Sequence, residues 1–301
     1  MSAGSTGEIV KALAVNVTIA VSKGVAAAIT GSGAMLAETL HSFADCGNQL
    51  LLLKGVKATQ RPADDEHPLG YGRTLYFYSF IVALLLFLGG GVFSIYEGVH
   101  KLAEPEPVGD IRMALVILAI SIVLEGWSTL SNLRAMRERR GNTSLLRYLR
   151  ETKDSDLIVV FGENSAAVLG LVFALVAVAL SKVTNDGRWD AIGSLAIGVV
   201  LIGVATFLAR EVKSLLVGES ADPSLLAHFR RLADEDPNVE EVLNVLTLQQ
   251  GPGEIVVAAK LRFRTGLTTE TLVDAINAFE RELKRRVPEV RWSFIEPDHV
   301  K

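Results

Sequence analysis

Hydrophobic residues are concentrated in the first two thirds of the chain, where they form long runs separated by short polar stretches. The runs contain few charges, and each has about 20 residues or more, the length that a helix needs to cross the apolar core of a bilayer. The predicted spans lie near residues 8–30, 33–57, 75–99, 111–134, 156–181 and 190–210. The pattern therefore predicts a membrane domain of six transmembrane helices over residues 1–210.

The connectors between these runs contain residues that end helices. Gly31-Ser32-Gly33 predicts a tight turn between the first two spans, and residues 61–68 are polar with two prolines. The two prolines within residues 104–107 break the chain after the third span, and Asn185-Asp186-Gly187 turns it before the sixth.

Beyond residue 210 the hydrophobic pattern becomes that of an ordinary charged domain. Residues 222–235 and 268–286 carry apolar side chains at helical spacing, whereas residues 239–250 and 254–263 alternate as strands do. Residues 290–296 form a last predicted strand. The order α-β-β-α-β over residues 211–301 predicts a small sheet with helices on one face.

Composition supports a membrane protein and excludes some other classes. Half of the 301 residues are hydrophobic, and the mean hydropathy of +0.35 is high for a soluble protein. Residues 211–301 hold 16 acidic and 12 basic side chains, so the net charge of −4 comes from this part. Such a balance provides no basic face for nucleic acid. Cys46 is the single cysteine, which excludes an internal disulfide and a cysteine-rich zinc site.

Lysine and arginine are distributed unevenly among the connectors. The connectors after the second and fourth predicted spans are rich in these residues, and the others are poorer. By the positive-inside rule, we expect these connectors, both termini and the C-terminal domain to face the cytoplasm. The basic residues concerned are Lys57, Arg61, Arg73, Arg134, Arg137, Arg139, Arg140, Arg147, Arg150 and Lys153. We expect no cleaved signal peptide, because the first apolar run lacks a clear cleavage site.

Polar side chains inside the predicted spans are functional candidates, because burying a charge in the bilayer is costly. His41 and Asp45 are spaced i and i+4, which places both on one face of the second span. The fifth span contains Glu163 and Asn164. Helix rise places Asp45 and Glu163 at similar depth, near the middle of the bilayer. Nitrogen and oxygen ligands from two helices could form the tetrahedral site that Zn²⁺ prefers.

Each candidate ligand also has a structural alternative. His41 could serve simply as a hydrogen-bond partner for a neighbouring helix and bind no metal. Glu163 could pair with Lys23, and Asn164 could join two helices by a hydrogen bond. Other charged groups in the spans that could act as proton or charge partners are Lys23, Glu38 and Glu125.

Four stretches of the chain together resemble one known family. Residues 37–49 are similar to the second helix of the cation diffusion facilitator family, and residues 67–73 resemble the motif that enters its third helix. Residues 162–170 are similar to its fifth helix, and residues 215–220 to the link into its cytoplasmic domain. The order of these motifs extends the resemblance over nearly the whole chain.

The resemblance implies a homodimeric metal/proton antiporter, a secondary active transporter and not an enzyme. It implies a ferredoxin-like cytoplasmic domain over residues 211–301 that regulates or dimerises, and a location in a bacterial inner membrane. The transported ion would be Zn²⁺ and the coupling ion H⁺, with His41, Asp45 and Glu163 binding metal when deprotonated and releasing it when protonated.

The fifth predicted span departs from the usual family pattern. Zinc-transporting members mostly carry His or Asp followed four residues later by Asp, a pattern that His41 and Asp45 keep. On the fifth span Val160 and Asn164 stand at those positions, with Glu163 as an added carboxylate. The sequence resembles a branch with Glu-Asp or Glu-Asn before Ser-Ala-Ala.

Other ions and other classes of protein remain open at this point. Ligation by Asn164 without His41 would favour Mn²⁺, and Fe²⁺, Co²⁺ and Ni²⁺ also suit such donors. The C-terminal domain has only His228 and His299, which argues against extra metal sites there. An intramembrane metalloenzyme would show a motif such as HExxH, which is absent. A metal sensor would need no ligands at the bilayer midplane.

Overall fold

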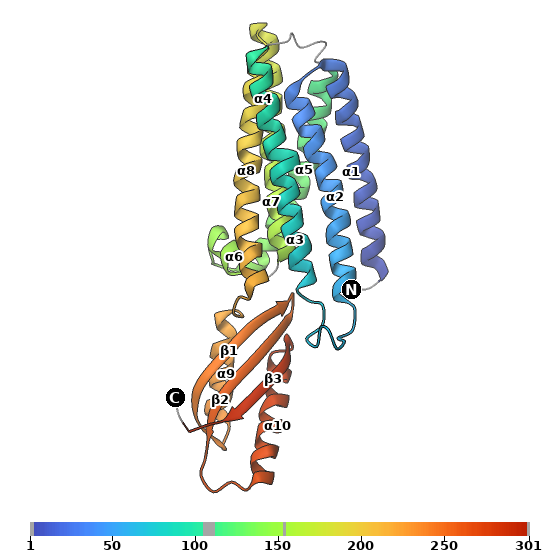
Figure 1. Ribbon diagram of the computed structural model, residues 1–301. Coiled ribbons are helices and arrows are strands. Elements are labelled where there is room, and N and C mark those ends of the chain that lie inside the picture. The colour runs from blue at the N-terminus through green and yellow to red at the C-terminus, as the bar shows by residue number, and fades with distance from the viewer. Residues whose placement is uncertain (1–2, 105–111, 153–154, 300–301) are drawn as a thin grey trace.

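The computed structural model describes residues 3–104, 112–152 and 155–299. It consists of an elongated bundle of long helices and a smaller unit of helices and strands at one end of the bundle (Figure 1). Lys153 and most of the predicted break at residues 104–107 lie outside the described residues.

The helices of the bundle follow the predicted spans. They are α1 (Ala3–Thr30), α2 (Gly33–Thr59), α3 (Thr74–Leu85), η1 (Leu86–Val92), α4 (Phe93–Ala103), α5 (Arg112–Arg140), α6 (Leu145–Glu151), α7 (Ser155–Thr184) and α8 (Arg188–Val217). Short turns join α1 to α2 and α7 to α8, where the sequence indicated them.

Four helical segments in the described residues are long and apolar enough to cross a membrane: Thr74–Ala103, Ala114–Glu138, Leu157–Thr184 and Arg188–Val217. These segments confirm a helical membrane unit. The described apolar part of α1 is shorter, Asn16–Thr30. Helix α2 is not among these segments. A six-helix membrane domain therefore stays a prediction.

Three features of the bundle differ from the predicted segments. The third segment is continuous, but its middle part η1 is a π-helix that contains Gly89-Gly90-Gly91. The charged connector after α5 is partly helical, because α5 continues to Arg140 and α6 follows. Helix α8 extends to Val217, beyond the predicted end at residue 210. Sequence hydropathy detects apolar length but not a change of helix type or the continuation of a helix into water.

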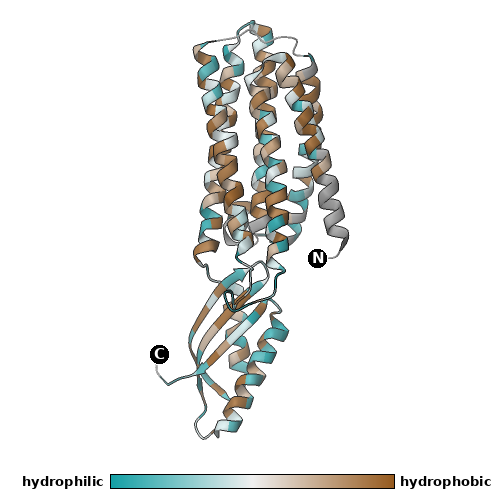
Figure 2. Cartoon of the chain, turned by 45° about the vertical axis from the view of Figure 1, so that its right-hand side comes forward, coloured by the Kyte–Doolittle hydropathy of each residue, from teal (hydrophilic) through white to brown (hydrophobic). Residues whose placement is uncertain are grey.

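Apolar side chains occupy both the interior and the outer surface of the bundle. Met35, Tyr76 and Leu201 are among the largest buried side chains, whereas Val123 and Trp127 of α5 are well exposed. Figure 2 shows hydrophobic residues along the whole length of the helices, and more hydrophilic colouring on the smaller unit. An apolar outer surface is what a helix in contact with lipid requires.

The smaller unit confirms the predicted order of elements. It contains α9 (Pro223–Glu235), β1 (Val239–Gly251), β2 (Glu254–Phe263), α10 (Thr269–Arg286) and β3 (Val290–Pro297). The strand order is β1-β2-β3, with β1 and β2 antiparallel and β2 and β3 parallel. The helices cover one face of this mixed sheet, and the rings of Phe229 and Phe279 pack edge to face at 5.2 Å in the core between them.

The loop between α2 and α3 contacts the smaller unit. Gly72 lies so close to the β1–β2 turn that an added Cβ would be 2.7 Å from the carbonyl oxygen of Gln250 and 3.1 Å from Cα of Gly251. A glycine is therefore needed at Gly72 for the loop to reach the sheet.

Candidate metal centre

Helix α2 carries several polar side chains and packs against α1, α3, α7 and α8. Glu38, His41, Ser42 and Asp45 follow one face of α2 at helical spacing. The first three are buried, and the side chain of Asp45 is 16% exposed. The sequence therefore places a strip of polar groups where packing with other helices removes them from lipid.

His41 and Asp45 lie next to each other on this strip. Nε2 of His41 is 3.6 Å from Oδ2 of Asp45, which is too long for a hydrogen bond but close enough for electrostatic attraction. In the part of the chain that the structure describes, neither ring nitrogen of His41 has a hydrogen-bond partner, and neither does Oδ1 of Asp45. Buried polar atoms are seldom left without a partner, so each such group calls for a functional explanation.

Glu163 of α7 is buried and meets α2 at a residue that the sequence reasoning did not select. The amide Nδ2 of Asn48 donates a hydrogen bond to Oε1 of Glu163, with a distance of 2.5 Å. Asn48 follows Asp45 by three residues, which is about one turn, or roughly 4.5 Å along the helix. Asn48 follows His41 by seven residues and Asp45 by three, and this helical spacing in the sequence could have identified it.

Lys23 of α1 contacts Glu38 and Ser42 of α2, and not Glu163. Its Nζ is 3.2 Å from Oε2 of Glu38 and donates a hydrogen bond of 2.8 Å to the hydroxyl of Ser42. The alternative in which Lys23 pairs with Glu163 is wrong for this conformation. Glu163 is hydrogen-bonded to Asn48 between α2 and α7, whereas Lys23 pairs with Glu38 between α1 and α2.

A small recess opens beside Asp45 and brings α5 to the centre. Its lining includes Asn16, Ile19, Ser42, Asp45 and Glu125, and its volume of about 10 Å³ suits a single water molecule. Glu125 interacts electrostatically with Asp45 and His41. Helices α1, α2 and α5 therefore meet at this recess.

The structure does not bring the four predicted ligands into one cluster. Within the described residues, no three His, Cys, Asp or Glu side chains are grouped closely enough to hold a metal ion. The carbonyl oxygen of Asn164 accepts a hydrogen bond from Thr129 of α5 at 3.4 Å. Val160, which the family resemblance places at the position of the first ligand, is 37% exposed. A shared site of His41, Asp45, Glu163 and Asn164 therefore stays a prediction.

Another buried acid, Asp190, binds the end of α2 that lies away from the sheet. Oδ1 of Asp190, at the start of α8, accepts a hydrogen bond of 2.5 Å from the Ser32 hydroxyl. Its Oδ2 accepts one of 2.6 Å from the backbone N–H of Gly33, and Lys101 of α4 lies 4.0 Å away. Asp190 thus supplies acceptors for the first turn of α2, whose backbone donors have no partner within the helix.

A bundle of apolar helices that encloses a buried histidine, a buried lysine and three buried carboxylates has the features of a membrane protein that handles ions. Residues 9–217 match the model of the cation efflux transmembrane domain. The chain therefore belongs to the cation efflux family.

Curated relatives agree with this family. The chain is similar to the proton-coupled zinc antiporter SLC30A9, mitochondrial, from Xenopus laevis, with 31% identity over 87% of this chain and 54% of the relative. The human protein of the same name is 30% identical over 87% of this chain and 53% of its own length. The zinc transporter ZitB of Pectobacterium atrosepticum is 26% identical, over 80% of this chain and 70% of that protein. The chain spans about half the length of the SLC30A9 proteins.

Proposed function

We propose that this chain is a secondary active transporter, and not an enzyme, that exports Zn²⁺ across a membrane in exchange for protons. The observation that carries this proposal is the pair of buried neighbours His41 and Asp45, whose ring nitrogens and Oδ1 have no hydrogen-bond partner among the described residues. Imidazole nitrogen and carboxylate oxygen are donors that Zn²⁺ accepts. The names of relatives with similar sequences, proton-coupled zinc antiporter and zinc transporter, support the same ion and the same coupling.

Exchange follows from the chemistry of these donors. A metal ion binds the deprotonated forms of His41 and Asp45, so metal binding releases protons and protonation expels the metal. In the proposed cycle Glu163 gives up its hydrogen bond to Asn48 and becomes a ligand. Asn164, on the same turn of α7, is the fourth proposed ligand, and alternating exposure of the centre to the two sides moves the ion.

The choice of metal depends on which donors bind. His41 with two carboxylates favours Zn²⁺, whereas a set of mostly oxygen donors that includes Asn164 would favour Mn²⁺. Fe²⁺, Co²⁺ and Ni²⁺ have to be compared in the same assay, because affinity order alone does not set selectivity.

For the orientation, we propose that both termini and the C-terminal unit face the cytoplasm of a bacterial cell, with the bundle in its inner membrane. Helix α1 begins at the end of the bundle that is nearest to the sheet (Figure 1). The C-terminal end of α2, the loop from α2 to α3 and the C-terminal end of α5, which contain the basic residues Lys57, Arg61, Arg73, Arg137 and Arg140, lie at that same end. This arrangement supports the cytoplasmic assignment through the positive-inside rule.

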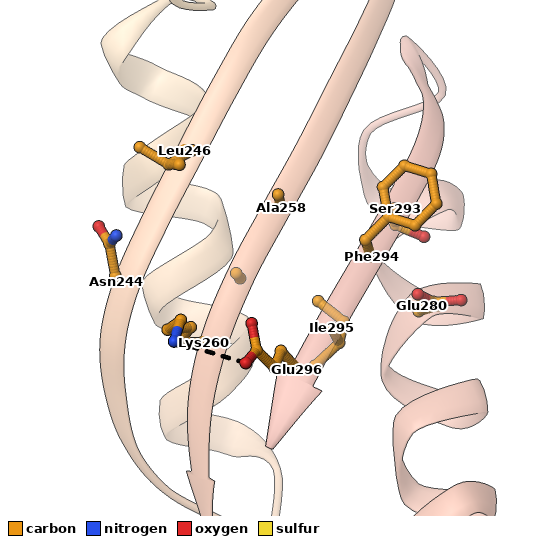
Figure 3. Close-up of a pocket in the computed structure, with 10 residues that line it drawn as sticks. Asn244, Leu246, Ala258, Lys260, Glu280, Ser293, Phe294, Ile295 and Glu296 are labelled. Carbon is orange, nitrogen blue, oxygen red and sulfur yellow. Dashed lines mark ion pairs between the residues drawn. The ribbon is translucent and has the colours of Figure 1, made fainter. Parts of the chain in front are cut away.

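We also propose that residues 211–301 form a ferredoxin-like unit that joins two copies of the chain through the open face of its sheet. Leu246, Ala258 and Phe294 are paired across the three strands and form an apolar row on this face (Figure 3). Leu246 is 63% and Phe294 58% exposed. Lys260 and Glu296 form an ion pair of 3.4 Å beside the row. A groove of about 380 Å³ runs over these residues, and an apolar core with a polar rim is typical of an interface.

The test of the transport function is metal flux in proteoliposomes under an imposed pH gradient, with Zn²⁺ and Mn²⁺ measured in parallel. We expect Zn²⁺ movement that follows the proton gradient and is lost in Asp45→Ala. Asp234→Ala, at an exposed position of α9, is the matched control and should transport normally. Metal flux that persists in folded Asp45→Ala would contradict the proposed site, and flux of neither metal in the wild-type chain would contradict the proposed function.

A further inference from the structure

Lys23 places a fully buried positive charge beside the candidate metal centre. Its side chain is 0% exposed, and its ammonium group contacts Glu38 and Ser42 of α2 at 3.2 and 2.8 Å. An ammonium group in the interior of a membrane helix is costly unless it is paired. The contact with Glu38 provides that pairing.

Glu38 is held between α1 and α7. Oε2 faces the ammonium group of Lys23, whereas Oε1 has no hydrogen-bond partner in the described residues. Oε1 lies directly against Gly170 of α7, where any added Cβ would collide with it. Glu38 is therefore a buried carboxylate whose charge is balanced by a group that belongs to the protein.

The influence of Lys23 extends to the carboxylates next to it. The uncharged Ser42 accepts a hydrogen bond from the ammonium group on one side. On the other side it lines the recess together with Asp45 and Glu125. Ser42 therefore connects the ion pair of Lys23 and Glu38 to the recess that Asp45 and Glu125 line. Glu38 thus contacts the cation directly, and Asp45 and Glu125 lie on the other side of Ser42.

We propose that Lys23 is a tethered cation that takes the place of a second ion and thereby sets how many divalent ions the centre binds. Buried charges are paired with an opposite charge or coordinate a metal ion. Because the ammonium group is covalently attached, Glu38 stays neutralised and is not available as a ligand. This inference rests on the proposed function, since it concerns the ion capacity of the same centre.

The first test counts bound metal. Zn²⁺ bound per subunit is measured on the purified full chain by equilibrium dialysis and calorimetry. Lys23→Met leaves Glu38 without its cation, and we expect this variant to bind one more Zn²⁺ per subunit than the wild-type chain. The double variant Lys23→Met/Glu38→Gln should return to the wild-type number. Lys54→Met, at an exposed position of α2, is the control and should leave the number unchanged.

A second arm does not depend on the folding of Lys23→Met. In Glu38→Gln the ammonium group loses its partner and acts fully on Asp45 and Glu125, so we expect Zn²⁺ affinity to fall by about tenfold or more. Removing both charges in the double variant should restore it. An unchanged ion count in folded Lys23→Met, or wild-type affinity in Glu38→Gln, would overturn the inference alone. A wild-type chain that binds no Zn²⁺ would overturn the proposed function and this inference with it.

Discussion

The side chain of Asn48 on α2 is hydrogen-bonded to that of Glu163 on α7, with 2.5 Å between Nδ2 and Oε1. Both side chains are buried, and each belongs to a helix that carries predicted metal ligands. The bond therefore joins α2 and α7 inside the bundle, and it occupies Glu163 in this conformation.

We expect Asn48→Ala to destabilise the chain by about 1–3 kcal/mol, because it leaves the buried Glu163 carboxylate without its donor. The measurement is the midpoint of thermal unfolding in detergent. The loss should be smaller when Glu163 is already replaced by glutamine, since residues in direct contact do not have additive effects. Equal losses in both backgrounds would mean that the hydrogen bond does not contribute to stability.

Two glycines of the π-helix η1 should differ in how strongly substitution by alanine affects stability. A Cβ at Gly91 would lie 2.6 Å from Cγ1 and 3.2 Å from the backbone nitrogen of Ile202 on α8, whereas a Cβ at Gly89 would meet nothing within 4 Å. Gly91→Ala should cost about 1–3 kcal/mol through overpacking, and Gly89→Ala should be neutral or slightly stabilising. Thermal unfolding of the two variants decides this, and similar midpoints would argue against close packing of η1 on α8.

Dimerisation through the sheet predicts a specific effect of charge on its open face. Phe294→Glu should convert the dimer to monomers in multi-angle light scattering, because a charge cannot be buried in an apolar interface without a partner. Val273→Glu introduces the same charge at an exposed position of α10 and should leave the dimer intact. A Phe294→Glu chain that stays dimeric would place the interface elsewhere.

The ion pairs of Glu282 on α10 should make the stability of the C-terminal unit depend on pH. Hydrogen bonds from Arg285 and Arg286 lower the pKa of Glu282 from 4.5 to about 2. A lowered pKa means that the stabilisation is complete above the unfolded value of 4.5 and is lost as the pH falls toward 2.

Glu282→Gln should therefore make α10 less stable at neutral pH and less sensitive to pH between 4.5 and 2. Hydrogen exchange of residues 223–297 in the full chain measures this effect. Asp274→Asn on the same helix is the control. An identical acid response in wild-type and Glu282→Gln chains would show that these ion pairs do not contribute.

The C-terminal unit was predicted almost residue by residue. Strand β2 occupies the expected residues 254–263, and α10 begins within one residue of the expected start. Alternation and helical periodicity are local, so the sequence pattern contains this information directly. The turn at residues 251–253 is local in the same way.

The candidate centre was predicted only in part. The shared face of His41 and Asp45 follows from the geometry of one helix, and the structure places these side chains 3.6 Å apart. The partners Asn48–Glu163 and Lys23–Glu38 depend on how far two helices are shifted along each other. A shift of one turn, about 5.4 Å, exchanges one partner for another, and hydropathy does not determine depth that closely.

The amino-acid sequence alone predicts long apolar helices followed by a small α/β unit, and an imidazole and a carboxylate on one face of α2. These properties depend on the order of residues within single elements. The folded structure was needed to show that Glu163 meets Asn48, that Lys23 meets Glu38, that Asp190 binds the start of α2, and that the third helix contains a π-helix against α8. These relationships arise from close packing between segments that are distant in the sequence, where side-chain volume and buried charge select one arrangement among several that hydropathy allows.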